Sequence, residues 1–166
     1  MRKLAILVLL AVELAIGGCG NSTSTTTTTT DASGNWEAQL TGGTGEASLL
    51  NFTTAFTVNN SGPLSITGFS FINTGTCFVS GETESGNATL ATDSTNAVTG
   101  TLTYTVQSGT PAGNTLTLTG NVTGTNSSNA LTGGAVTGTW SLTGGTGCTG
   151  TGNFTMCQNA TTCSTT

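Results

Sequence analysis

The side chains of this chain that could do acid–base chemistry are carboxylates. Glu82 and Glu84 stand two residues apart, so they share one face of a strand, and Asp93 follows at the next expected turn. Three such groups could bind Ca²⁺ through their oxygens, and two could act as acid and base in glycoside hydrolysis. Their spacing matches no calcium-binding loop, and carboxylates two apart at a strand end are commonly exposed. We therefore interpret them as a solvated acidic edge and predict no metal site.

Most other catalytic side chains are missing from the sequence. The chain has no His, and its two basic residues are Arg2 and Lys3. Nucleic-acid binding needs cations that displace counterions, and clamps for phosphate or carboxylate groups use Arg or Lys. A general base near neutral pH is most often His, and a Ser or Thr nucleophile needs a base to activate it. We predict a protein that is not an enzyme, holds no cofactor and binds no nucleic acid; catalysis by carboxylates alone is the enzymatic alternative.

The start of the chain has the order of an export signal. An apolar run over residues 4–12 follows the two basic residues. This order is typical of a secretory signal peptide, and the run is shorter than the ~20 apolar residues that span a bilayer. The segment ends in Ile16-Gly17-Gly18-Cys19, which resembles the lipobox of bacterial lipoproteins. The resemblance implies that residues 1–18 are removed and that Cys19 receives a diacylglyceryl group. An ordinary signal peptide with a chance cysteine is the alternative.

The residues after the cysteine predict a tether and a location. An Asp directly after the lipidated cysteine resembles a signal that retains lipoproteins in the inner membrane of enteric bacteria. This chain has Gly20 at that position, which favours the outer membrane. Residues 21–30 read NSTSTTTTTT, a polar low-complexity tract with nothing to bury. We predict a lipidated, disordered tether over residues 19–34 and a β domain over residues 35–166. The protein is then exported and lipid-anchored in the cell envelope.

Four cysteines remain after Cys19, and their even number in an exported chain indicates two disulfides. Four cysteines allow three pairings, and the sequence does not decide among them. We favour Cys77–Cys148 together with Cys157–Cys163, because the second pair closes a short local loop. In the loop-entropy model the first pair would stabilise the fold by about 4 kcal/mol.

The body of the chain predicts strands. Residues 35–157 form short alternating runs rich in Thr and Val, separated by Gly, Asn, Ser and Pro, and no apolar run has a helical period. We predict no helix after residue 18 and an all-β antiparallel meander of about 8–9 strands, closed into a small barrel, with a β-sandwich as the alternative. The expected strands are 47–58, 64–71, 77–82, 86–92, 97–107, 114–123 and 135–142, with a last one around Phe154 and Met156.

Repeated glycines fall on the apolar face of these strands. Gly100, Gly120 and Gly138 each stand two residues after an apolar residue. Glycine weakens a strand interior, so its repetition predicts the crowding relief and strong curvature that barrel closure needs. Drift in a Gly- and Thr-rich composition is the alternative interpretation.

The aromatic residues supply a candidate ligand site. Trp36, Tyr104 and Trp140 would line a cavity, and the two tryptophans would meet if the barrel closes. An ordinary aromatic core explains the same residues. The opening Gly34-Asn35-Trp36 and the meander resemble avidin-like and lipocalin-like barrels. A ligand held against the aromatic residues would be a small apolar or sugar-like molecule.

The whole layout resembles small bacterial lipoproteins with a Thr/Gly-rich β domain and C-terminal cysteines. With the missing catalytic side chains, it predicts an envelope lipoprotein that acts as a non-enzymatic structural or interaction module, with the membrane and an envelope protein as partners. A small-ligand-binding β-barrel is the alternative function.

Overall fold

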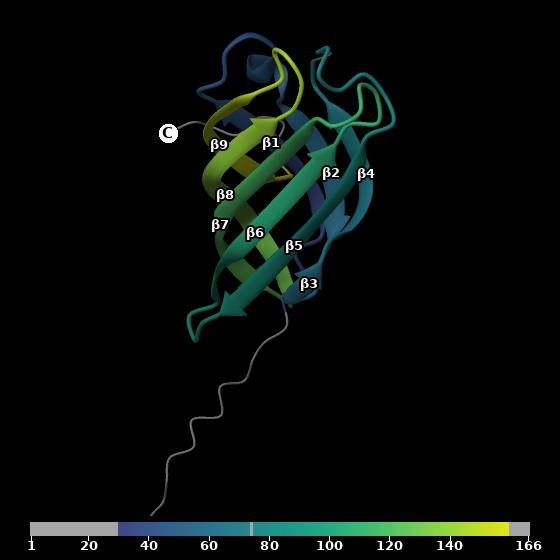
Figure 1. The fold of residues 1–166 in the computed structure, drawn as a ribbon. Coiled ribbons are helices and arrows are strands. Elements are labelled where there is room, and N and C mark those ends of the chain that lie inside the picture. Colours follow the sequence, from purple (N-terminus) through teal and green to yellow (C-terminus); the bar gives the residue numbers. More distant parts are fainter. Residues whose placement is uncertain (1–29, 74, 160–166) are drawn as a thin grey trace, which may run out of the picture.

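Nine β-strands build one antiparallel sheet that curls into a nearly closed barrel (Figure 1). The computed structural model describes residues 30–73 and 75–159, to which all structural statements apply. The all-β barrel predicted from the sequence is thus confirmed over the sandwich. Its elements are β1 (Gly34–Thr41), the 3-10 helix η1 (Gly45–Leu49), β2 (Phe52–Thr57), β3 (Ser61–Pro63), β4 (Ser65–Phe71), β5 (Thr83–Thr92), β6 (Ala97–Gln107), β7 (Thr115–Ser127), β8 (Ala130–Thr143) and β9 (Gly150–Gln158).

Five consecutive strands form the long wall of the barrel. From β5 to β9 each strand pairs with the next, β1 then pairs with β9, and β2 pairs with β1. On β6 the buried side chains Val98, Leu102 and Tyr104 face inward, and exposed threonines alternate with them. This alternation is the reason that the sequence predicts β6 with its observed bounds. Threonine is β-branched and polar, so it suits a pleated surface that faces water.

Barrel closure depends on the path of residues 61–71, which changes partners along its length. β3 pairs with β5, whereas β4, which follows after Leu64, pairs with β2. The Leu64 N–H donates to the Gly86 carbonyl oxygen at 2.9 Å, and beyond this point no ladder joins β4 to β5. We call the unpaired gap between Ser65–Phe71 and Thr83–Ser85 the seam. The barrel is therefore closed on one side of Leu64 and open along the seam on the other.

The two ends of the barrel are tied by different contacts. At the Thr30 end, Asn126 Nδ2 donates to Thr30 Oγ1 at 2.7 Å, and Thr30 is 1% exposed. At the disulfide end, buried Asn114 donates from Nδ2 to the Cys77 carbonyl oxygen at 2.7 Å and accepts at Oδ1 from the Gly145 N–H at 2.9 Å. Each buried asparagine thus joins backbone segments that are distant in sequence.

The packed domain starts earlier than the sequence predicts. Asp31 forms β-bridges with Asn59 and Ala130, and Ala32 is buried. The sequence places residues 30–34 in the predicted tether, yet tertiary contacts hold them and Gly34 begins β1. Residues 19–29 of the predicted tether, like the signal peptide, lie outside the described residues.

Three local predictions are wrong. The start of the expected strand 47–58 is the 3-10 helix η1, so the expectation of no helix after residue 18 is wrong as well. The buried Ala47 of η1 packs near Gly150 at the disulfide end. The expected strand 77–82 is irregular, with a single bridge between Ser80 and Thr110. Its path is set by the disulfide at Cys77 and by tertiary contacts, which outweigh local strand propensity.

The inward-facing glycines allow neighbouring backbones to approach closely, as predicted. A Cβ atom at Gly138 would overlap the Thr119 carbonyl oxygen and the Gly120 Cα, and one at Gly100 would overlap the Thr89 carbonyl oxygen. Gly120 and Gly138 are ladder partners, so two strands lack side chains at the same level. The sheet can therefore coil tightly there without displacing the aromatic core.

We predict that Gly138→Ala lowers the free energy of unfolding by about 2 kcal/mol or more, because the added methyl group meets backbone and not a side chain that can move. The matched control is Gly145→Ala, where a Cβ atom meets nothing within 4 Å, and we expect a change within about 0.5 kcal/mol. Chemical denaturation of both variants measures the difference. Equal stability of the two variants would contradict the close-approach argument.

The disulfide between Cys77 and Cys148 confirms one predicted pair. Its Cα atoms are 5.6 Å apart, and it links residues separated by 71 positions. Cys157 is also disulfide-bonded, and Cys163, its predicted partner, lies outside the described residues. The long bridge holds the irregular segment 77–82 against the loop between β8 and β9.

The double variant Cys77→Ala/Cys148→Ala should lose about 3–4 kcal/mol of unfolding free energy, since closing a loop of this length restricts the unfolded chain. Urea denaturation under oxidising conditions, compared with the parent chain, measures the loss. A double variant as stable as the parent would show that the bridge does not brace the fold.

Candidate functional site

The three aromatic residues proposed as ligand contacts lie in a packed interior, where Trp36 and Tyr104 both contact Phe56. Trp36 stacks on Phe56 with ring centroids 5.3 Å apart, and Tyr104 stacks on Phe52 at 5.4 Å. The Trp140 Nε1–H donates to the Thr41 carbonyl oxygen at 2.9 Å. Each ring is at most 2% exposed, so each serves the core in this structure.

The two tryptophans do not meet. Trp36 pairs with Gln158 and Trp140 pairs with Gly152, which places them six residues apart along β9. At ~3.3 Å per residue this is about 20 Å along the strand. The expectation of a meeting followed from their places near opposite ends of the sequence, but the tilt of the strands puts them at opposite ends of the barrel.

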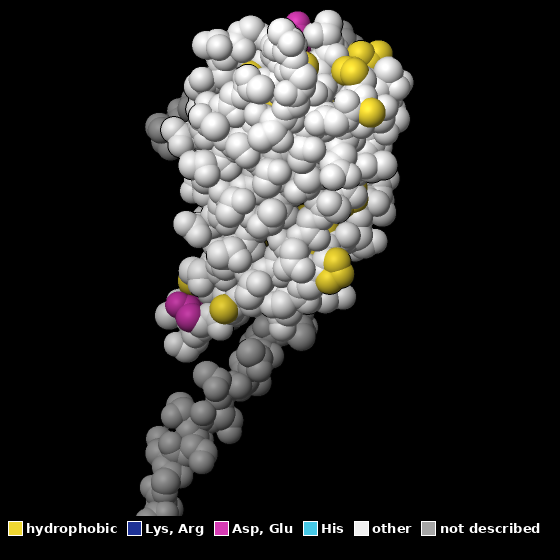
Figure 2. All heavy atoms as spheres, viewed as in Figure 1, with side chains coloured by type: hydrophobic (Ala, Val, Ile, Leu, Met, Phe, Trp, Pro, Cys, Tyr) yellow, Lys and Arg dark blue, Asp and Glu magenta, His cyan; other side chains and the backbone are white. Residues whose placement is uncertain are grey.

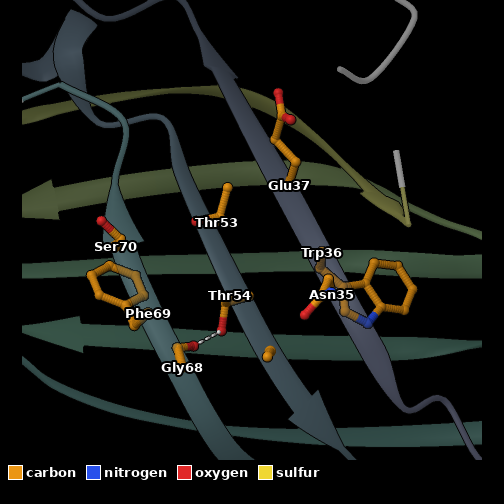
Figure 3. A pocket seen from close by; sticks show the side chains of 9 residues that line it. Asn35, Trp36, Glu37, Thr53, Thr54, Gly68, Phe69 and Ser70 are labelled. Carbon is orange, nitrogen blue, oxygen red and sulfur yellow. Dashed lines mark hydrogen bonds between the residues drawn. The ribbon is translucent and has the colours of Figure 1, made fainter. Parts of the chain in front are cut away.

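One open hollow crosses the outer face of β1, β2 and β4 (Figure 3). Its volume is about 370 Å³, and its polar groups include Asn35, Glu37, Thr53 and Ser70. Gln39 Nε2 donates to Glu37 Oε1 at 3.2 Å, and the Glu37 side chain is 6% exposed. The aromatic rings behind this hollow belong to the core, so it offers a polar surface without a stacking platform.

A second hollow lies at the disulfide end of the seam, with a volume of about 210 Å³. Its lining combines aromatic rings with a carboxylate: Phe69, Phe71, Phe78, Val79 and Glu82, with Ser70 and Asn73. The rings of Phe71 and Phe78 lie 5.0 Å apart, and those of Phe69 and Phe71 lie 4.9 Å apart. This hollow therefore places a carboxylate next to a cluster of aromatic rings.

Glu84 faces the interior side of the sheet beside this hollow. It alternates in phase with the buried residues Ala88 and Leu90 and pairs with buried Val106. Burial raises the pKa of the Glu84 carboxyl above its ordinary value, a backbone hydrogen bond opposes this, and the charge of nearby Glu82 adds to the rise. Of the predicted pair, Glu84 lies on β5 and Glu82 directly precedes this strand, and both side chains are partly buried, so the expectation of a fully solvated acidic edge is wrong.

Asp93 lies at the other end of β5. Its Oδ1 accepts from the Thr95 N–H at 2.8 Å, from Thr95 Oγ1 at 2.7 Å and from the Ala97 N–H at 2.9 Å, and these hydrogen bonds lower its pKa. Asp93 therefore caps a turn, about 30 Å along the strand from Glu84 at ~3.3 Å per residue. Within the described residues, no group of three or more His, Cys, Asp or Glu side chains could hold a metal ion.

Tyr104 lies behind the seam and is held as a neutral phenol. Its hydroxyl shares a 2.7 Å hydrogen bond with Thr54 Oγ1, which also donates to the Gly68 carbonyl oxygen at 3.0 Å. Burial strongly raises the pKa of Tyr104, with a further rise from the charge of Glu84 and an opposing effect of the Thr54 hydrogen bond. A phenol that keeps its proton is not poised as a general base.

The sequence analysis missed the seam and the exposed residues Ile72 and Val79 beside it. Ile72 is 52% exposed and Val79 is 61% exposed. The inward position of Glu84 could have been found from its phase with Ala88 and Leu90. The seam itself has no local signal, because it arises from the change of partners at Leu64.

Comparisons of the chain with protein-family models, with curated proteins and with solved structures find no match. Within the described part of the chain, no helix is long and apolar enough to cross a membrane.

Glu84→Gln should stabilise the fold more at about pH 7 than at about pH 4. The folded state raises the pKa of the Glu84 carboxyl, so the protonated carboxyl stabilises the fold at low pH. This stabilisation is lost as pH rises through the folded-state pKa, whereas Gln stays neutral at both pH values. Chemical denaturation of parent and variant at both pH values measures the difference.

Asp93→Asn is the matched control and should show the opposite trend. The folded state lowers the pKa of Asp93, so its carboxylate stabilises the fold above its ordinary pKa range and less as pH falls. An effect of Glu84→Gln that is the same at both pH values would contradict the desolvation of Glu84.

Proposed function

We propose that this chain is an exported envelope lipoprotein, anchored through Cys19, whose β domain is a non-enzymatic structural or interaction module. The observation that carries the proposal is the ending Ile16-Gly17-Gly18-Cys19 after a short apolar run that begins with two cations. The lipid holds the chain at the outer membrane, and the Thr-rich tract spaces the domain from the surface.

The geometry of the barrel supports the anchored arrangement. Thr30, the first described residue, enters at the end of the barrel where Asp31 bridges Asn59 and Ala130. The Cys77–Cys148 bridge lies at the opposite end. A tether that enters at the Thr30 end leaves the disulfide end and its seam free to face outward.

The chemistry of the described residues supports a role without catalysis. After Lys3 the chain has no Lys, Arg or His, and the two neighbouring carboxylates are Glu84 on β5 and Glu82, which directly precedes this strand. An acid–base pair for glycoside hydrolysis flanks the scissile bond from two sides, which two residues so close on one chain segment do not do. The mutual stacking of the interior rings favours a structural module over a ligand-binding barrel.

Lipid anchoring can be tested on the full chain expressed with export in a bacterial host. We expect a fatty-acid label on the chain and its partition into detergent, both lost in Cys19→Ala, because that thiol is the acceptor. Labelling with an alkynyl fatty acid followed by phase separation measures both. An unlabelled parent chain, or a label that survives Cys19→Ala, would overturn the anchor.

A further inference from the structure

The seam exposes strand edges that have no ladder partner. β4 pairs with β2 on one side only, and on the other side it diverges from β5 after the Leu64–Gly86 hydrogen bond. β5 pairs with β6 along its whole length, so Thr83–Ser85 also have one open side. Such edges present backbone N–H and C=O groups in the spacing that an added strand can use.

Apolar surface lies next to these edges. Phe69, Phe71 and Phe78 line the hollow at the disulfide end of the seam. Ile72 and Val79 are the large hydrophobic residues of the described chain that are more than half exposed. Figure 2 shows apolar side chains reaching the surface at this end of the barrel and also at the opposite end, on a face that is otherwise polar. Exposed apolar surface that borders a hollow commonly marks an interaction site.

Charge complementarity decides which occupant fits. Glu82, which directly precedes β5, lines the hollow at the seam, and Glu84 lies on the inner face of β5 beside it; the chain after Lys3 has no cation to pair with them. A second copy of the domain would bring only further carboxylates, which repel these two. A segment with Lys or Arg would supply the missing charge, and their long apolar stems can lie over the aromatic rings while the charged ends reach the carboxylates.

We propose that the seam binds an extended, basic and apolar segment of a partner protein, which adds as a strand alongside β4. Its inward side chains lie over Phe69 and Phe71 and bring Lys or Arg toward Glu82 and Glu84. This inference rests on the proposed role as an interaction module and names its surface and the chemistry of its partner. It does not depend on the lipid anchor.

The test uses the exported full chain, purified in detergent, and a capped synthetic peptide of about eight residues that could add as one strand. The peptide carries Thr at outward positions and alternates Val with Lys at inward positions. We expect it to bind and to slow amide hydrogen exchange in Ser65–Phe71 and Thr83–Ser85. The same peptide with Glu in place of Lys, and one N-methylated on its pairing edge, should each bind at least tenfold more weakly.

Variants of the chain separate the seam from a general acidic surface. Glu82→Gln together with Glu84→Gln keeps the side-chain shapes, and we expect about a tenfold weaker affinity for the Lys peptide. Asp93 is a carboxylate at the Thr30 end, away from the seam, so Asp93→Asn should leave the affinity for the Lys peptide unchanged. Unchanged exchange outside the seam in both variants verifies that the fold is intact.

Several results would overturn the inference. These are no binding of the Lys peptide at millimolar concentration, equal binding of the Glu peptide, or protection of amides away from the seam. A concentration-dependent dimer that protects the seam would assign it to a second copy. If the chain carries lipid but binds no peptide, the lipid anchor stands and the binding role of the seam is overturned. If it binds the peptide but carries no lipid, the binding role stands and the lipid anchor is overturned.

Discussion

The close approach of backbones at the inward glycines is the constraint on which this barrel depends. The interior holds two tryptophans, a tyrosine and several phenylalanines, and the sheet must coil tightly to enclose them. Gly120 and Gly138 face each other across β7 and β8, and the backbones meet where side chains would stand. Large rings at other levels, such as Trp140, then have room. The glycines and the large aromatic residues of the inner face therefore depend on each other, because close backbone approach at one level leaves space for the rings at another.

The same packing explains why closure stops at the seam. β4 bends away from β5 and lays Phe69 and Phe71 beside Phe52 and Tyr104, so aromatic contact replaces backbone pairing along this edge. A bulge between Ala55 and Phe56 on β2 accompanies the bend. An open edge is an aggregation hazard, and inward-facing charges such as Glu84 are one way in which natural sheets limit it. Glu84 is thus costly to the isolated fold and useful at an edge that must stay selective.

The sequence predicts those features of the fold that have a local period. β6 matches its expected bounds because apolar residues and threonines alternate from Val98 to Val106, with Gly100 at one position of the apolar face. The inward glycines were found because they keep the phase of the apolar face. Features that depend on contacts between distant segments were not predictable in this way. The packing of Thr30 against Asn126, the role of Asn114 at the disulfide end and the seam at Leu64 all require the closed barrel before any pattern explains them.

The candidate site illustrates the same division. Spacing predicts one face for Glu82 and Glu84, and the alternation of Glu84 with buried Ala88 and Leu90 on β5 indicates that its face is the inner one. Their proximity to Phe69 and Phe71 follows only from the change of strand partners, since the aromatic residues lie on a strand that pairs elsewhere. The described domain has carboxylates and no Lys, Arg or His, so its electrostatic field attracts basic segments and repels a second copy. The seam adds unpaired strand edges and aromatic surface to that field, and these features give the attraction a defined place on the barrel.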